Sequence, residues 1–184
     1  MERLPKPTPT WALSFPEPRS HPPGISPEAL HELVTTKAPV VDFLVIDVRR
    51  TDVDVRPIFK VPWYCRASLP AIFRLPQAVI PGAVNLPAQT FYPLLPTLTT
   101  VLEKIPIIIF HCSSSLGRAP RCAGWLEDSL PPDSKCKVFI LEGGMKAWRT
   151  RFWEDKRMIV VMPLEDTEGT GTGTGKRGGY VGNW

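Results

Sequence analysis

Three short apolar runs, separated by stretches with helical spacing, constrain the fold of this chain most. Residues 40–48, 105–111 and 137–141 are rich in Val, Ile, Leu and Phe. Short continuous runs of this kind are typical of strands buried on both faces of a parallel sheet. Helical patterns at residues 119–130 and 145–153 follow the last two runs. The alternation predicts an α/β fold with a mostly parallel central sheet flanked by helices on both faces, and a ligand site beyond the carboxyl ends of the strands.

Most of the 184 residues are expected to form one domain. We predict an irregular Pro-rich arm at residues 1–25, because prolines recur there without any periodic apolar pattern. The domain is predicted at residues 26–160, and an atypical insertion at 51–79 interrupts it. A genuine lid or docking insertion and a gene-model error such as a retained intron explain that insertion equally well. Residues 161–184 are rich in Gly and Thr, which predicts a flexible tail.

Two further helices are expected in the first half of the domain. Ser26, Pro27 and Glu28 supply a cap, a first-turn proline and an early acid for a short helix. Residues 89–104 also have helical spacing, but we expect that helix to be broken near its prolines, Pro93 and Pro96.

Composition excludes several classes of function. The formal charge of +4 comes from scattered Lys and Arg without a block of like charges, so we expect no nucleic-acid partner. The four cysteines show no C-x-x-C spacing and the chain has three histidines, so no metal site is expected. The apolar runs are too short for a signal-peptide core or a membrane span. We therefore expect a protein of the cytoplasm or nucleus, not secreted and without a membrane partner, whose thiols stay reduced.

The chemistry of this chain is concentrated where the second apolar run ends, in the sequence His-Cys-Ser-Ser-Ser-Leu-Gly-Arg. A loop between a strand and a helix can direct several backbone N–H groups at one anion. The spacing lets the chain curl so that the Cys112 sulfur and the Arg118 guanidinium meet the same anion. The expected oxyanion-binding loop consists of Ser113, Ser114, Ser115, Leu116 and Gly117.

A nucleophilic role for Cys112 follows from its surroundings. A helix N-terminus and a neighbouring arginine both favour the thiolate form of a cysteine. A thiolate in such a cup can attack phosphorus, arsenic or sulfur, while the loop amides stabilise the charge on the remaining oxygens. We therefore predict Cys112 and Arg118 as the catalytic residues.

Four ordered segments resemble the rhodanese-like domain superfamily. They are Val45-Ile46-Asp47-Val48-Arg49, Ile80-Pro81-Gly82-Ala83-Val84-Asn85-Leu86-Pro87, the loop from His111 to Arg118, and Leu141-Glu142-Gly143-Gly144-Met145-Lys146-Ala147-Trp148. The loop counts seven residues from Cys112 to Arg118, which is similar to M-phase-inducer-type phosphatases and fungal-type arsenate reductases, whereas sulfurtransferases of this superfamily close the loop in six.

The resemblance implies a cysteine-dependent protein-tyrosine or dual-specificity phosphatase that forms a cysteinyl-phosphate intermediate. Its substrate would be a phosphorylated protein or a small oxyanion, and no cofactor is expected. The first alternative is an arsenate reductase that uses the same loop, with glutathione or glutaredoxin as co-substrates. The loop holds no acidic residue to protonate a leaving group, and this favours the alternative. A sulfurtransferase and a non-catalytic anion-binding module are further alternatives.

Four other residues are candidates for supporting roles. Asp47 and Arg49 end the first apolar run, and we expect them to pair with each other or with nearby loops rather than to act in catalysis. His111 either tunes the thiolate or packs beside it, and the packing role is favoured. The resemblance places Glu142 near the active loop, where it could orient substrate, although capping the last helix is the simpler expectation.

Overall fold

The computed structural model describes residues 10–49 and 77–162 of the chain. Their centre is a five-stranded sheet in the order β1-β6-β5-β2-β4, and all its neighbouring strands run parallel. Asp47 at the end of β2 pairs with His111 at the end of β5, so both lie at the carboxyl edge of the sheet. The strands are β1 (Gly24–Ile25), β2 (Phe43–Asp47), β4 (Val84–Asn85), β5 (Ile107–His111) and β6 (Lys137–Leu141).

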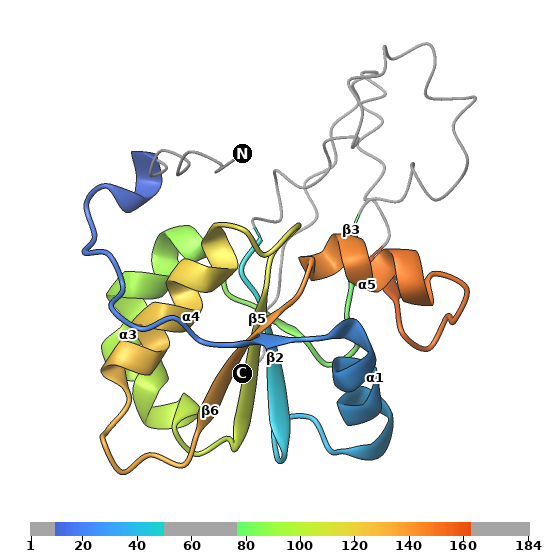
Figure 1. Cartoon of the computed structure of the whole chain (residues 1–184), viewed down its shortest axis with the longest axis horizontal. Helices are drawn as coiled ribbons and strands as arrows, with labels where there is room; N and C mark the ends of the chain where they lie inside the picture. The colour runs from blue at the N-terminus through green and yellow to red at the C-terminus, as the bar shows by residue number, and fades with distance from the viewer. Residues whose placement is uncertain (1–9, 50–76, 163–184) are drawn as a thin grey trace, which may run out of the picture.

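Helices cover both faces of this sheet, as Figure 1 shows. One face carries α3 (Ala88–Leu102) and α4 (Arg118–Ser129), and the other carries α1 (Pro27–Thr36) and α5 (Gly144–Phe152). Each face has its own apolar core, built around Trp125 on the first side and Trp148 on the second. The predicted α/β architecture, a mostly parallel sheet between two helical layers, is therefore confirmed.

The helix α3 is continuous, so the predicted break near Pro93 and Pro96 is wrong. Both prolines are exposed, while Phe91 and Leu95 on the opposite side of the helix are buried in the core. A proline removes one helical hydrogen bond and bends the helix. Here the buried face supplies enough packing to hold the helix together across that loss.

The first strand of the sheet lies within the segment that we predicted as an irregular arm. Gly24 and Ile25 pair with β6, and a short 3-10 helix, η1 (Thr10–Ala12), stands further upstream. Figure 1 shows the chain between them running along α4 before it reaches α1. These residues form few regular elements because their prolines favour extended backbone, yet they pack on the domain. Residues 1–9 lie outside the described part of the chain.

A second, two-stranded sheet joins the end of the predicted insertion to the predicted start of the tail. β3 (Gln77–Val79) runs antiparallel to β7 (Val160–Met162). The remainder of the insertion, 51–76, and of the tail, 163–184, lies outside the described residues, so neither prediction is tested there. The strand β2 begins at Phe43, three residues after the start of the apolar run, because a turn at Val40 and Val41 precedes it.

Candidate active site

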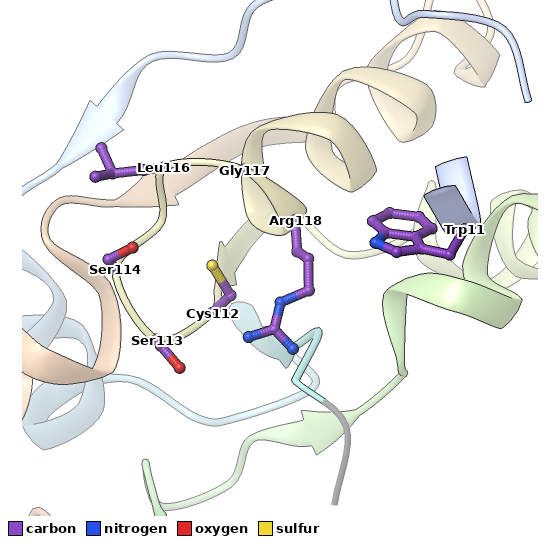
Figure 2. A pocket seen from close by; sticks show the side chains of 7 residues that line it. All are labelled: Trp11, Cys112, Ser113, Ser114, Leu116, Gly117 and Arg118. Atoms are coloured by element: carbon purple, nitrogen blue, oxygen red, sulfur yellow. The ribbon is translucent and has the colours of Figure 1, made fainter. Parts of the chain in front are cut away.

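Cys112 follows the central strand β5 directly, and Arg118 is the first residue of α4. Both line one pocket of about 280 Å³. Figure 2 shows the Arg118 guanidinium on one side of the Cys112 side chain, with Ser113 and Ser114 on the other. The predicted nucleophile and the predicted oxyanion clamp therefore share one concave site. Its lining residues are Trp11, Cys112, Ser113, Ser114, Leu116, Gly117 and Arg118.

The start of α4 supplies hydrogen-bond donors at this pocket. Gly117 is the N-cap residue and makes no side-chain capping bond. The N–H groups of the first helical turn have no carbonyl partners within a helix, and they carry the positive end of the helix dipole. A strand, a short loop and a helix N-terminus thus place donors where a bound oxyanion would sit beside the sulfur.

The first turn of α5 holds the Cys112 loop from behind. The Met145 N–H donates to the Cys112 carbonyl at 2.9 Å, and the Lys146 N–H donates to the Ser113 carbonyl at 3.0 Å. Gly144, with φ of +59°, approaches so closely that a Cβ there would lie 2.5 Å from the Cys112 carbonyl oxygen. The resemblance implied that this turn lies near the active loop, and the structure brings the two together.

Ser115 differs from the other predicted loop residues, because it does not line the pocket. It is buried, has a φ of +51°, and its hydroxyl has no hydrogen-bond partner among the described residues. Its Oγ faces Gly144, 2.9 Å from where a Cβ would stand. Ser115 therefore packs on the inner side of the loop, away from the pocket. Leu116 instead lines the pocket rim, where its side chain is 66% exposed.

Behind the loop, the buried Asp47 and His111 and the partly buried Arg49 form a polar group. The Arg49 guanidinium donates to both Asp47 carboxylate oxygens, at 2.6 to 2.9 Å, and also to the Ala78 carbonyl. His111 Nε2 lies 3.8 Å from Asp47 Oδ2. Burial alone would raise the pKa of Asp47, but the neighbouring His111 and Arg49 outweigh it and lower that pKa. The expected structural pairing of Asp47 with Arg49 is confirmed, and none of the three residues lines the pocket.

Glu142 does not cap α5, and it does not line the pocket. It is exposed, its N–H donates to the Ile25 carbonyl at 3.0 Å, and its carboxylate faces Gly24. The N-cap of α5 is Gly143, without a side-chain capping bond, so the predicted capping by Glu142 is wrong. The pairing of β1 with β6 explains the difference, because it brings Gly24 of the edge strand beside the Glu142 carboxylate.

The residue that sequence reasoning missed is Trp11. It comes from η1, in the segment read as an irregular arm, and stands beside Arg118 in Figure 2. A single tryptophan among prolines carries no periodicity, so no sequence signal assigns it to the pocket. Within the described ranges, no three potential metal ligands cluster. None of the helices there is both long and apolar enough to cross a membrane.

The other thiols in the described ranges are poor nucleophiles by their surroundings. Burial raises the pKa of Cys122, which is inside α4, far above its usual value, and the nearby Cys112 raises it further. Burial also raises the pKa of Cys136 to about 11. Cys136 precedes β6, so it lies at the amino edge of the parallel sheet, opposite the edge that carries Cys112.

Comparison with known proteins finds one family model and one similar characterised protein for this chain. The profile of the family described as "Rhodanese-like domain" matches residues 26–151. The dual specificity phosphatase ibp1 of Schizosaccharomyces pombe is 31% identical over 98 residues, which cover 44% of this chain and 71% of the relative.

Solved structures with the same fold include two informative neighbours. Ygr203w, described as a yeast protein tyrosine phosphatase of the rhodanese family, superposes with a TM-score of 0.57 at 20% identity, covering 76% of this chain and 92% of its own. The As-Sb reductase from Leishmania major has a TM-score of 0.50 at 25% identity, covering 76% of this chain and 86% of its own. The first similarity shows the fold alone.

Proposed function

This chain belongs to the rhodanese-like domain family, and on that basis we propose that it is a cysteine-dependent phosphatase of the protein-tyrosine or dual-specificity type. One observation carries the proposal: Cys112 and Arg118 line the same pocket, at the end of a buried strand and the start of a helix. The similarity to dual specificity phosphatase ibp1 supports it. The proposed substrate is a phosphorylated protein, met in a reducing compartment such as the cytoplasm or nucleus.

The proposed reaction has two steps. The Cys112 thiolate attacks phosphorus, an S–P bond forms, and the bond from phosphorus to the leaving oxygen breaks, so that oxygen departs with the electron pair and takes a proton from solvent. Water then attacks the cysteinyl-phosphate, the S–P bond breaks, and thiolate and inorganic phosphate are released. The Arg118 guanidinium and the amides at the α4 N-terminus stabilise the charge on the phosphoryl oxygens in both steps.

The pocket favours a leaving group that needs little protonation. None of its described lining residues is an aspartate or glutamate. A phenol, as in tyrosine, has a pKa of about 10 and departs as a tolerably stable anion. An aliphatic alkoxide is a far stronger base, so its departure depends more on a general acid. We expect aryl phosphates to be hydrolysed faster than alkyl phosphates.

The same lack of an acid keeps arsenate reduction as the second candidate. The Cys112 thiolate would displace a hydroxyl group from arsenate, which leaves as water after protonation by solvent. Two thiols of glutathione or glutaredoxin would then become a disulfide and supply the two electrons that reduce As(V) to As(III). Water would finally break the S–As bond, which releases arsenite and the Cys112 thiolate. The likeness to the As-Sb reductase from Leishmania major supports this candidate. Sulfur transfer and non-catalytic anion binding rank behind both.

Parallel assays of purified protein decide between these functions. One measures hydrolysis of phenyl phosphate and the other measures arsenate reduction with glutathione and glutaredoxin. Cys112→Ser should remove the activity, while Cys136→Ser, at the opposite edge of the sheet, should keep it. Hydrolysis without arsenate reduction supports the phosphatase. The reverse result supports the reductase, and an active Cys112→Ser protein would refute both.

A further inference from the structure

An N-terminal strap, residues 10–20, is fastened along one side of α4. The indole N–H of Trp125 donates to the Pro16 carbonyl at 2.8 Å. Arg121 donates to the Glu17 carboxylate at 2.7 Å. Farther along the same helix, the Asp128 carboxylate accepts from both the backbone N–H and the hydroxyl of Ser20. Positions 121, 125 and 128 share one helix face, so the strap lies along a single face of α4.

The close approach of the strap depends on Gly124. A Cβ at this position would lie 2.6 Å from the Ser20 carbonyl oxygen and 2.7 Å from the Pro18 Cβ. Contacts this short are not tolerated, so any side chain here would push the strap away from α4. Three polar side chains of α4 therefore bind the strap, and the absence of a side chain at Gly124 leaves room for it.

An aromatic cluster places the far end of the strap at the pocket. The Trp11 ring meets Trp125 edge to face with centroids 6.3 Å apart, and Phe15 meets Trp125 at 5.9 Å. Tyr92 of α3 completes the cluster, 4.9 Å from Trp125 and 5.0 Å from Phe15. Ala12, next to Trp11, is fully buried. Trp11 is therefore held beside Arg118 by packing against Trp125, which lies outside the Cys112 loop.

Trp11 is half-buried, and part of its surface lines the pocket. Figure 2 shows Trp11 and Leu116 on opposite sides of the Cys112 sulfur and the Arg118 guanidinium. The loop supplies the donors for an oxyanion, whereas the indole offers a flat apolar face or edge to whatever the oxyanion is attached to. Aromatic rings pack against such a surface better than short alkyl groups do.

From this arrangement we propose that Trp11 contacts the organic group of the substrate and makes the site selective for aryl phosphate monoesters, such as phosphotyrosine. This inference rests on the proposed phosphatase function and adds a specificity residue from outside the loop. A pocket of about 280 Å³ lies at the small end of ligand pockets, and suits one ring with its phosphoryl group. Loss of one aromatic contact should lower affinity about three- to tenfold.

The test compares a ligand that carries a ring with one that does not. In Trp11→Ala, kcat/KM for phenyl phosphate should fall about three- to tenfold, mainly through KM, while the inhibition constant of inorganic phosphate changes less than about twofold. Trp11→Phe should recover most of the loss. Leu13→Ala is the matched control, because Leu13 belongs to the same strap and is 67% exposed. Gly124→Ala should reproduce the effect of Trp11→Ala by moving the strap.

Binding measurements without turnover test the role of Trp11 independently of the proposed phosphatase activity. Calorimetric titration of Cys112→Ser protein, with and without Trp11→Ala, measures the affinities for phenyl phosphate and inorganic phosphate without turnover. If the wild-type chain is inactive, the proposed function fails, yet a selective loss of phenyl phosphate binding still supports the contact between Trp11 and the organic group. Equal losses for both ligands, or no loss for phenyl phosphate, would overturn the inference. Circular dichroism must show that both variants remain folded.

Discussion

The contact between Gly144 and the Cys112 loop can be tested by adding one methyl group. In Gly144→Ala, the new Cβ would lie 2.5 Å from the Cys112 carbonyl oxygen and 2.9 Å from the Ser115 backbone nitrogen. Neither backbone atom can move without shifting the loop. The φ of +59° adds strain, about 1–2 kcal/mol for a residue with a Cβ. Overpacking adds about 1–3 kcal/mol.

Taking about 3 kcal/mol from these two effects, we expect the melting temperature of Gly144→Ala to fall by about 6–12 °C. We also expect kcat/KM to fall by up to about a hundredfold, because a displacement of about 1 Å in a catalytic group can cost that much in rate. Thermal unfolding followed by circular dichroism and kcat/KM for phenyl phosphate, measured well below the melting temperature, check the two parts separately.

Gly117→Ala provides the stability control for this experiment. Gly117 lies in the same loop, but a Cβ there would have no neighbour within 4 Å and its φ is −153°. It should cost about 1 kcal/mol or less, mainly as a poorer N-cap. A Gly144→Ala protein that melts within about 2 °C of the wild type and keeps its kcat/KM would refute the close approach described above.

Three further predictions concern the site and the core. Asp47→Asn removes the charge that Arg49 binds and should lower the free energy of unfolding by about 3–5 kcal/mol near neutral pH. Folding lowers the pKa of Asp47, so this difference from wild type should shrink as pH falls below about 4. Trp148→Ala should cost about 3–5 kcal/mol in urea unfolding, against at most about 0.5 kcal/mol for the exposed Val41→Ala. Arg118→Ala should abolish turnover and weaken phosphate binding, and wild-type kinetics in that variant would contradict the mechanism.

Local sequence was sufficient to predict the central strands β5 and β6 and the helices that follow them. The strand β6 occupies Lys137–Leu141, the same residues as its apolar run, and α4 begins within one residue of the prediction. These elements depend on periodicity and capping among neighbouring residues, which can be read along the chain. The break expected in α3 was wrong because its stability comes from the buried face that it presents to the sheet, and that face forms only in the folded domain.

The sequence by itself determined the strand, the loop and the helix start that carry Cys112 and Arg118, since residues so close along the chain depend on local geometry. Only the tertiary structure decided what surrounds them. Gly144 supports the loop from a later turn, and Trp11 reaches the pocket from the other end of the domain. Such contacts depend on hydrogen bonds and packing between residues far apart in sequence, such as Trp125 with Pro16, and no local pattern records them.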